Sequence, residues 1–571
     1  MNLYYFLRHH KKSIILGPIF KLVESIFELI IPVIMANIID FGIKNQDISY
    51  IIKMGYFIIA LSLLGFISAI ICQYMAARAS QGIGSEIRNA LYEKINSVSF
   101  YEIDKIGTAS LTTRITSDVS SLQNAIAMSI RLGARIPFIV FGSLIMAYII
   151  DKQLSIIFFI AVPVISVISF IIAAKSSRLF TISRYKLDKL SHIAKENLDG
   201  VRVIRAFSRQ KGEINRFNKA SEEYLSNGIS ALKIFSLMPP SAYVIVNSVI
   251  ILIIWLGAMR INSGNLMPGK ITALINYTTQ ILFALFLAAS LLTTFTKAYA
   301  SYRRIFDVLN IENEVIPENS ISSYTTSNFS YPKVEFKNIN FSYTDSDETQ
   351  LLNINFKIMA GETLGIIGST GSGKTTIAKL LLKFYSANQG EILLDGVNIC
   401  QYDTKFLRKK IKAVPQDAVL FSGTIDENLR MGNEKISTES INKALCISQS
   451  MEFVSSMPEK IQSYIERGGK SLSGGQRQRL TIARAIAAEP EILLLDDSMS
   501  ALDAGTSSKL KSSLDTLNGM TKIIISQKIT DIWNANQILV LDNGKSVGLG
   551  THKYLLKECN IYKDLYKSQL Q

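Results

Sequence analysis

The chain has 571 residues, of which 48% are hydrophobic and only 19% are charged, and its formal net charge is +15. Soluble domains carry about 25% charged residues, so this composition excludes a disordered chain, a coiled coil and an ordinary soluble enzyme. The length corresponds to roughly three or four domain-equivalents. We therefore expect a membrane protein, or a membrane domain joined to a soluble one.

The cysteine and histidine content indicates neither a disulfide framework nor a metal centre. The chain has four histidines and four cysteines, namely Cys72, Cys400, Cys446 and Cys559. The cysteines are too few and too widely spaced for disulfide-rich or CxxC chemistry. The histidines leave little material for a metal site.

Six apolar segments lie in the N-terminal half of the chain. They cover residues 13–39, 54–77, 136–150 with an extension over 119–130, 154–174, 234–259 and 271–296. A helix of about 20 residues crosses a hydrocarbon core of about 30 Å, so the pattern predicts six transmembrane helices. The first segment is interrupted by Lys21 and no small-residue cleavage site follows it, so we do not expect a cleaved signal peptide.

The connections between these segments alternate between long and short. Residues 78–135 and 175–233, together with residues 1–12, contain 23 Lys and Arg, whereas the three short connections contain five. The positive-inside rule predicts that both termini and both long loops are cytoplasmic. The positive net charge then reflects topology, and we expect no nucleic-acid partner. Both long loops show helical periodicity, and turns at their tips, over 107–118 and 200–207, are placed to touch a cytoplasmic domain.

The character of the sequence changes after residue 310. Residues 311–332 are polar and typical of a linker, and from residue 333 short β-rich runs alternate with helical patterns, which indicates an α/β domain. The expected strands are residues 363–367, 391–394, 411–414, 492–495, 522–525 and 538–541. The predicted architecture is an α-helical six-span transmembrane domain (1–310), a linker (311–332) and an α/β domain with a P-loop (333–571).

The P-loop follows the first of these strands. The motif GxxxxGK[ST] places backbone N–H groups around phosphate oxygens at a helix N-terminus, with Lys374 at the β- and γ-phosphates and Thr375 at Mg²⁺. We expect ATP to be bound by Gly368, Ser369, Thr370, Gly371, Ser372, Gly373, Lys374, Thr375 and the following Thr376. A glycine-rich turn without a ligand is the alternative, and the strand, the lysine and the threonine together argue against it.

Two further motifs lie downstream of the P-loop. The apolar strand 492–495 runs into Asp496, where P-loop proteins place the carboxylate that holds Mg²⁺. Before it stands a motif whose hydroxyl, small residues and helix start suit a second phosphate contact, made of Leu472, Ser473, Gly474, Gly475 and Gln476. With this signature between the two Walker motifs, the whole chain resembles the ABC transporter family. Its six helices and two long loops resemble one half of a type IV ABC exporter.

The resemblance assigns roles to further residues. It implies that Tyr343 stacks on adenine, although a core tyrosine is the alternative, and that Gln416 contacts Mg²⁺ and senses the transmembrane domain. It places Asp503 in the D-loop and makes the two loop tips coupling helices. In this family two nucleotide-binding domains pair head to tail, with each ATP between the P-loop of one and the signature of the other, so the chain must dimerise.

Two catalytic positions depart from the family pattern. Asp497 stands where the family has the glutamate that polarises the attacking water, and Gln527 stands where it has the switch histidine. Aspartate is one methylene shorter, and a misplacement of ~1 Å costs on the order of 100-fold in rate, while glutamine cannot shuttle a proton as histidine does. Because the signature is intact, we expect a degenerate own site and a non-identical partner half-transporter that carries the catalytic Glu and the switch His. The alternative is a homodimer in which Asp497 suffices.

The substrate is indicated only by two carboxylates. Glu24 and Glu28 lie one turn apart on the first membrane helix, at a depth where ionisable residues usually face an interior or a water-filled cavity. As substrate residues they favour cationic amphipathic molecules. As structural residues they pair with Lys21 or with a basic residue on another helix.

The favoured function is an ATP-driven exporter of amphipathic, multidrug-type molecules in a lipid bilayer, with ATP and Mg²⁺ as cofactors. An importer of metal-chelator complexes, a homodimeric exporter of lipids or peptides, and a regulatory subunit that retains ATP are the alternatives. The richness in Ile, Lys and Asn favours a bacterium with an A/T-rich genome and hence the cell (inner) membrane, with both termini and the nucleotide-binding domain cytoplasmic.

Overall fold

The computed structural model describes residues 2–312, 331–343, 349–431, 433, 435–517 and 519–570. The chain divides into two compact units, the first comprising Met1–Ser97 and Ile106–Ile311, and the second Val98–Lys105 and Glu312–Gln571. Most of the expected linker falls on residues 313–330, which lie outside the described residues. The expected domain boundaries at 310 and 332 therefore remain predictions.

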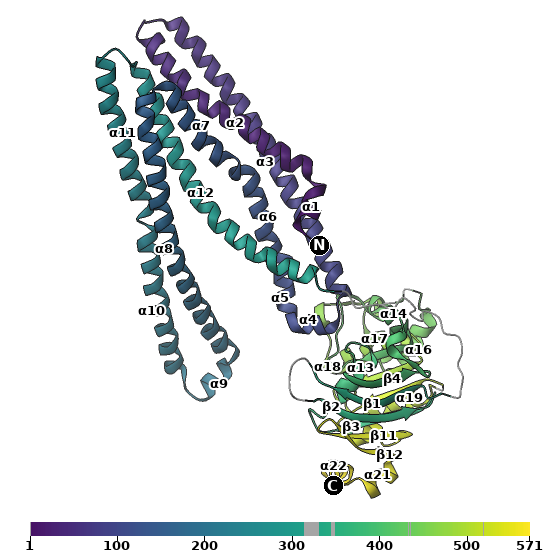
Figure 1. Ribbon diagram of the computed structural model, residues 1–571. Helices are drawn as coiled ribbons and strands as arrows, with labels where there is room; N and C mark the ends of the chain where they lie inside the picture. Colours follow the sequence, from purple (N-terminus) through teal and green to yellow (C-terminus); the bar gives the residue numbers. More distant parts are fainter. Residues whose placement is uncertain are drawn as a thin grey trace. The chain divides into compact units, whose positions relative to one another are not determined.

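The first unit is built from long helices (Figure 1). The elements are α1 (Leu3–His9), α2 (Lys11–Asn37), the π-helix η1 (Ile38–Ile43), α3 (Ile48–Ser97), α5 (Thr108–Thr113), the π-helix η2 (Arg114–Asp118), α6 (Val119–Met128), the π-helix η3 (Ser129–Gly133), α7 (Arg135–Ile150), α8 (Lys152–Asp199), α9 (Val201–Ala206), α10 (Gln210–Phe235), α11 (Met238–Asn262) and α12 (Pro268–Leu309). The short helix α4 (Phe100–Ile106) lies between α3 and α5.

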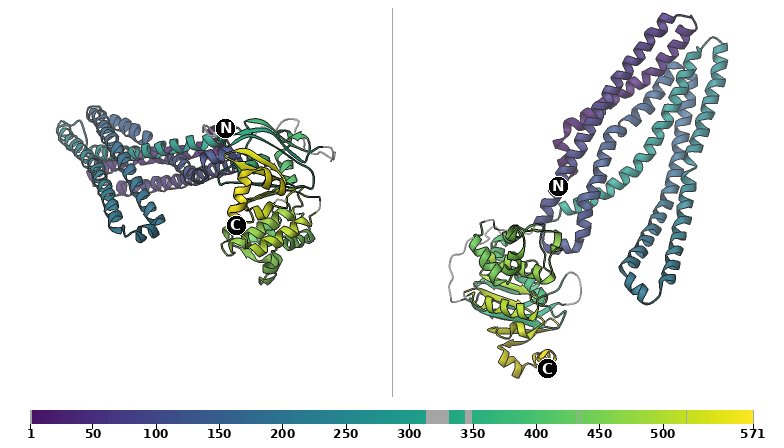
Figure 2. Two further views of the ribbon diagram at one scale, coloured as in Figure 1. Left: turned by 90° about the horizontal axis from the view of Figure 1, so that it is seen from below. Right: turned by 180° about the vertical axis from the view of Figure 1, so that it is seen from behind.

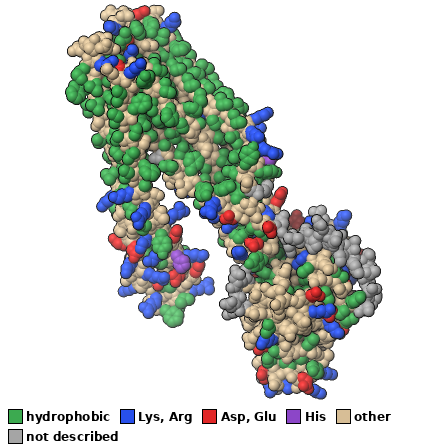
Figure 3. All heavy atoms as spheres, viewed as in Figure 1, with side chains coloured by type: hydrophobic (Ala, Val, Ile, Leu, Met, Phe, Trp, Pro, Cys, Tyr) green, Lys and Arg blue, Asp and Glu red, His purple; other side chains and the backbone are tan. Residues whose placement is uncertain are grey.

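Six stretches of this unit are long and apolar enough to cross a membrane, which confirms the predicted six spans. They are Lys11–Ile43, Ile48–Ser97, Thr108–Ile150, Lys152–Asp199, Gln210–Asn262 and Pro268–Leu309. Hydrophobic side chains cover much of the visible surface of the helices, whereas charged side chains gather around α9 (Figure 3). This distribution matches helices that pass from lipid into water.

The helices pack in two ways. One core joins α2, α7, α8, α11 and α12, and the Tyr277 hydroxyl on α12 donates a 2.6 Å hydrogen bond to the Leu29 carbonyl on α2 inside it. Beyond the core, α8 and α10 run side by side as a two-helix arm that ends at α9 (Figure 2). The Lys186–Glu223 ion pair of 2.8 Å joins the two helices of the arm.

The tip of the first long loop lies earlier in the chain than predicted. Helix α3 ends at Ser97 and α4 follows, and Gly107, with a φ of 82°, separates α4 from α5. The expected tip over 107–118 is therefore wrong, because these residues form the returning arm. The glycine ends the tip instead of beginning it. The expected second tip, 200–207, contains α9.

The second unit is an α/β domain. Its strands are β1 (Val334–Phe341), β2 (Leu351–Ile358), β3 (Thr363–Gly368), β4 (Gln389–Leu394), β5 (Val397–Asn398), β6 (Ile411–Val414), β7 (Gly423–Thr424), β8 (Tyr464–Ile465), β9 (Ile492–Asp496), β10 (Thr521–Ile525), β11 (Gln537–Asp542) and β12 (Lys545–Gly550). Its α-helices are α13 (Lys374–Leu381), α14 (Thr404–Lys410), α15 (Ile425–Leu429), α16 (Thr438–Ile447), α17 (Met451–Ser456), α18 (Gly474–Ala487), α19 (Ala504–Asp515), α20 (Ile529–Ile532), α21 (His552–Glu558) and α22 (Asn560–Leu570).

Ten of these strands form one sheet in the order β5-β4-β1-β2-β12-β11-β3-β10-β9-β6. The five strands β11, β3, β10, β9 and β6 are parallel, and β10 lies between β3 and β9. Ile525 of β10 pairs with both Ile366 of β3 and Asp496 of β9. The carboxyl ends of the three central strands therefore meet at the same edge of the sheet.

A cluster of four charges ties the antiparallel part of the sheet to the end of α14. Asp395 accepts from the Lys333 ammonium at 2.9 Å and the Lys410 ammonium at 3.2 Å, and Glu491 accepts from the same two lysines. Asp395 has a φ of 53°, a left-handed conformation that asparagine also tolerates. The substitution Asp395→Asn thus removes the charge without adding backbone strain.

We expect Asp395→Asn to lower the stability of this unit by on the order of 1–3 kcal/mol, because two poorly exposed lysines lose a shared carboxylate. Thermal unfolding of the full chain in detergent measures the shift. The control Lys337→Gln breaks the exposed Lys337–Glu335 pair of 3.4 Å and should change the unfolding temperature much less. Equal shifts in the two variants would contradict the assignment.

Candidate nucleotide-binding site

The P-loop connects β3 to α13 at the carboxyl edge of the sheet. Gly373 caps α13 in a left-handed conformation with a φ of 96°, which a side chain rarely adopts. A Cβ at Gly368 would collide with the Leu541 carbonyl oxygen of β11. The loop therefore needs glycine at both positions in order to turn tightly into the helix N-terminus, where backbone N–H groups bind anions.

Lys374 lies over this loop. It is buried, with 8% of the residue exposed, and its ammonium donates to the carbonyl oxygens of Gly368 at 2.9 Å and Ser369 at 2.7 Å. Burial lowers the pKa of Lys374, an effect opposed by the carboxylates of Asp497 and Asp496. Phosphate oxygens are stronger acceptors than peptide carbonyls, so the side chain is positioned to bind a phosphate at this loop.

Two oxygen-bearing side chains meet beside the lysine. The Thr375 hydroxyl donates to Asp496 at 3.2 Å, and Asp496 is buried at the end of β9. Burial raises the pKa of Asp496, and the hydrogen bond from Thr375 opposes the rise. A hydroxyl and a carboxylate are the hard oxygen ligands that Mg²⁺ prefers, so the pair fits this ion, which when bound neutralises charge on the phosphates.

The two residues that depart from the family pattern are in direct contact. The Gln527 side-chain amide donates to the Asp497 carboxylate at 3.2 Å, and the Gln416 amide donates to the same oxygen at 3.5 Å. The contact follows from the strand order, because Gln527 leaves β10, which lies between β3 and β9. Burial raises the pKa of Asp497, and a backbone hydrogen bond from Gln527 opposes the rise.

The turn after β10 is shaped by its own side chains. The Ser526 hydroxyl donates to Asp531 at 2.6 Å and accepts from the Lys528 backbone N–H at 3.0 Å. Asp497 itself has a φ of 48°, and its backbone N–H donates to the Ile525 carbonyl at 2.9 Å. Both backbones are thereby fixed, so the Asp497–Gln527 contact is built into the edge of the sheet.

Tyr343 lies next to the P-loop helix. Its hydroxyl and that of Thr376 form a 3.2 Å hydrogen bond, and its ring packs edge-on against Phe341 and Tyr385. The Lys379 ammonium lies 5.2 Å from the ring centre. Tyr343 is therefore a half-buried aromatic residue beside the P-loop helix.

The signature residues form the start of α18. Ser473 accepts from the Gln476 backbone N–H at 3.2 Å, and the Gln476 side chain accepts from the Ser473 backbone N–H at 2.9 Å, which completes a capping box. Leu472 is buried, whereas Ser473 and Gly474 are exposed and a Cβ at Gly474 would meet open space. The first turn of α18 is thus held in the domain by the buried Leu472, while Ser473 and Gly474 are exposed at the surface of this chain.

The D-loop lies beside the signature. A Cβ at Gly475 would lie 3.4 Å from the Ala501 carbonyl oxygen, and Asp503 caps α19 by accepting from the Thr506 backbone N–H at 2.9 Å. That hydrogen bond lowers the pKa of Asp503. Among the described residues, no hydrogen bond joins the signature 472–476 to the P-loop 368–376, and the two motifs begin different helices, α18 and α13.

The sequence did not single out the segment Val98–Lys105, which belongs to the second unit. The Phe100 ring lies 4.1 Å from the Phe384 ring, and the Tyr385 hydroxyl donates to the Asp104 carboxylate. The Arg408 guanidinium lies 4.9 Å from the centre of the Phe384 ring. The only sequence signal was the aromatic and acidic character of residues 98–105, which resembles any amphipathic turn.

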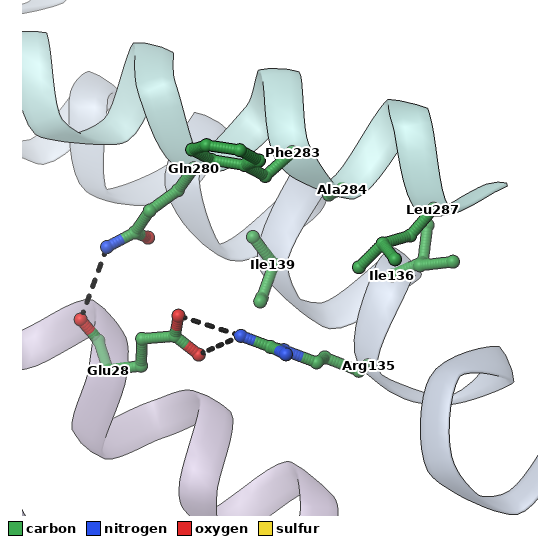
Figure 4. A pocket seen from close by; sticks show the side chains of 8 residues that line it. All are labelled: Glu28, Arg135, Ile136, Ile139, Gln280, Phe283, Ala284 and Leu287. Carbon is green, nitrogen blue, oxygen red and sulfur yellow. Dashed lines mark hydrogen bonds and ion pairs between the residues drawn. The ribbon is translucent and has the colours of Figure 1, made fainter. Parts of the chain in front are cut away.

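The two membrane carboxylates are both ion-paired. Lys21 contacts Glu24 at 2.7 Å, and the Arg135 guanidinium contacts both oxygens of Glu28 at 2.9 Å (Figure 4). Gln280 of α12 donates to the Glu28 carbonyl at 3.5 Å. This arrangement matches the structural alternative, in which the carboxylates pair with basic residues, and it leaves neither carboxylate as an uncompensated negative charge.

A six-span helical domain joined to an α/β domain with a P-loop, a Walker B aspartate and a separate signature defines a subunit of an ATP-driven membrane transporter. Comparisons with known proteins agree. Residues 14–285 match the ABC transporter transmembrane region, and residues 351–500 match the ABC transporter family.

Relatives and a solved structure extend the match over the whole chain. The chain is 35% identical to the ABC transporter ATP-binding protein YfiB of Bacillus subtilis, over 96% of this chain and 95% of that protein. It is 32% identical to a protein of Rickettsia bellii whose name describes an export ATP-binding/permease protein, over 98% and 97%. A bacterial Atm1-family ABC exporter with ATP bound shares the fold, with a TM-score of 0.82 at 22% identity over 98% of this chain and 99% of that chain.

The chain therefore belongs to the ABC transporter family. It is a half-transporter with the exporter-type fold and an ATPase coupled to transport across a membrane.

The Glu28–Arg135 pair gives a test of the membrane charges. We expect Glu28→Gln and Arg135→Gln each to lower the unfolding temperature and the yield of the full chain, because each leaves one charge unpaired among the helices. The double variant should recover part of the loss, with a coupling of about 1–3 kcal/mol. Thermal unfolding in detergent measures it, and Glu93→Gln on the exposed surface of α3 is the neutral control. Strict additivity of the two single losses would contradict the pairing.

Proposed function

We propose that the chain is one subunit of a heterodimeric ATP-driven exporter, with a degenerate ATP site of its own and a signature that serves the partner's catalytic site. The observation that carries the proposal is a contrast within one domain. Asp497 and Gln527, the two non-consensus catalytic residues, contact each other at 3.2 Å, whereas the signature is complete and its helix start is open.

The contact supports slow hydrolysis for a chemical reason. A residue that polarises water needs a free carboxylate oxygen at the right reach, and a switch residue at this position must respond to the γ-phosphate. Here one Asp497 oxygen already accepts from the amides of Gln527 and Gln416. Neither amide can take up a proton at neutral pH, so the site is suited to hold ATP more than to cleave it.

The proposed roles of the remaining site residues follow from their positions. Residues 368–376 and Tyr343 bind ATP, while Thr375 and Asp496 hold Mg²⁺ with Gln416 nearby. Ser473 and the N–H groups at the start of α18 contact the partner's ATP, and Asp503 shapes the D-loop between the two sites. The domains are proposed as 1–310, 311–332 and 333–571.

The proposed setting is the inner membrane of a bacterium, with both termini and the nucleotide-binding domain in the cytoplasm. The bias of Lys and Arg toward the long loops supports this orientation. The direction of transport is outward and the substrate is amphipathic, as the exporter-type fold and the aromatic lining of the helical unit suggest. The cationic preference expected from Glu24 and Glu28 is not carried forward, because both carboxylates are paired.

The first test is the identity of what purifies with the chain. We expect a tagged chain, extracted from its native membrane in mild detergent, to bring down a second ABC half-transporter in equal amount, with Glu after its Walker B aspartate and a switch His. Mass spectrometry and native mass determination measure this. Recovery of a homodimer alone would overturn the heterodimer and require Asp497 to support turnover.

A second test restores the degenerate site. In the complex, Ser473→Arg in this chain should block the partner's site and abolish most ATP hydrolysis. Adding Asp497→Glu and Gln527→His should raise the rate by on the order of 10–100-fold, because the added methylene and imidazole restore reach and proton transfer.

The matched control for this test is Asp497→Asn in the same Ser473→Arg background, which should stay inactive. Phosphate release measures all three rates. The proposal would be wrong if Ser473→Arg left the rate unchanged, or if the restored residues added nothing while ATP binding was intact.

A further inference from the structure

The helical unit contains a cavity of about 820 Å³ that the nucleotide chemistry does not use. Helices α8, α10, α11 and α12 line it, and its volume lies in the range of sites for drug-sized ligands, about 300–1,000 Å³. It is separate from the smaller cavity of Figure 4, which lies among α2, α7 and α12.

The lining of this cavity changes from apolar to charged along the helices. Ala173, Met238 and Phe286 belong to the uncharged membrane segments. Phe180 and Phe235 follow near the ends of these segments, with their rings 6.0 Å apart in an edge-on arrangement. The apolar part of the cavity thus continues the membrane interior toward the side of the long loops.

The charged part begins where the uncharged segments end. Lys297 is the first charged residue after the segment 271–296, and Arg184 and Asp188 lie on α8 beyond the segment 154–174. The charged side chains that line the cavity are therefore two cations and one carboxylate, all beyond the ends of the uncharged segments. The net formal charge of the side chains that line the cavity is therefore positive.

The cationic side chains of the cavity differ from those of the α8–α10 arm in their ion pairing. Lys186 pairs with Glu223 at 2.8 Å, and Arg216 pairs with Glu196 at 3.0 Å. Among the described residues, neither Arg184 nor Lys297 forms an ion pair with a carboxylate. Lys186 and Arg216 of the arm are therefore neutralised by carboxylates, whereas Arg184 and Lys297 at the cavity can bind the anionic group of a ligand.

We propose that this cavity binds the substrate as an anionic amphiphile, with the apolar body among Phe180, Phe235 and Phe286 and the acidic head at Arg184 and Lys297. The inference rests on the proposed function and names its substrate class. The head is a carboxylate, sulfonate or phosphate, which guanidinium and ammonium groups bind through charge-assisted hydrogen bonds. Asp188 disfavours a second negative charge, so a monoanion fits best.

The experiment measures binding of three fluorescent probes that share a dansyl-undecyl body and carry a sulfonate, a carboxamide or a trimethylammonium head. The full chain, with any partner that purifies with it, is placed in zwitterionic nanodiscs without nucleotide, and empty nanodiscs correct for partitioning into lipid. We expect the sulfonate probe to bind about tenfold more tightly than the trimethylammonium probe, because two partly solvated cations each contribute a fraction of this factor.

Substitutions test whether Arg184 and Lys297 cause the preference for the sulfonate probe. Arg184→Gln with Lys297→Gln should weaken binding of the sulfonate probe about tenfold and leave the carboxamide probe within about twofold. The double change Arg184→Glu and Lys297→Glu should reverse the preference. The control Lys175→Gln with Lys195→Gln removes the same charge from exposed positions of α8 that do not line the cavity and should leave all three affinities unchanged.

Adding phosphatidylglycerol to the nanodiscs tests whether the occupant of the cavity is a membrane lipid or a free amphiphile. A loss of affinity for the sulfonate probe means that an anionic lipid headgroup occupies the cavity, and an unchanged affinity means that free amphiphiles bind there. Equal affinities for the three probes, or equal weakening by the control variant, would overturn the proposal. Because no nucleotide is present, such a failure is distinct from a failure of the proposed ATP-site asymmetry, which phosphate release and partner analysis report.

Discussion

The arrangement of the nucleotide site depends on the position of β10 between β3 and β9. Parallel pairing of Ile525 with both Ile366 and Asp496 aligns the carboxyl ends of three strands that are far apart in sequence. The P-loop, the Walker B aspartate and Gln527 meet at one edge for this reason. Central strands of such a sheet are buried on both faces, so the register is held by the core and not by the polar residues it positions.

The same geometry explains why the two unusual residues belong together. Asp497 directly follows β9 and Gln527 leaves the neighbouring β10, so a change at one position alters the partner of the other. An aspartate and a glutamine hydrogen-bond at 3.2 Å here. The signature lies on a different element, α18, and is stabilised by its own capping box. A substitution at the sheet edge therefore does not touch the residues that shape the signature, and this separation is the physical reason why we propose a subunit with unequal contributions to two sites.

The sequence predicted the membrane spans, several strands and the P-loop, because the pattern for each of these lies within a short stretch of the chain. The six apolar segments, the strand 411–414 and the P-loop glycines each follow from periodicity or from backbone freedom within a few residues. The antiparallel strands β1, β2 and β12 were not predicted. Strand β1 pairs with β2, and β12 with β11, through register shifts that a single sequence does not reveal. The predicted position of the first loop tip was wrong because Gly107 marks a turn but does not indicate whether the tip precedes or follows it. The Glu28–Arg135 pair joins residues 107 positions apart, and a single sequence offers no means of choosing that arginine over Lys21 as the partner.

Helix α12 links the two polar regions of the membrane unit. Gln280, Phe283, Ala284 and Leu287 repeat at helical spacing and face the Glu28–Arg135 pair (Figure 4). Phe286, Thr293 and Lys297 repeat at the spacing of an adjacent face and line the larger cavity. A charge in hydrocarbon is costly unless it is paired, so the first face is held by an ion pair that resists change, whereas the second ends at a lysine outside the apolar segment. Helix α12 thus contributes to a neutralised ion-paired cavity on one face and to a cavity with two cations on the adjacent face, and the proposed preference for an anionic ligand depends on the second cavity.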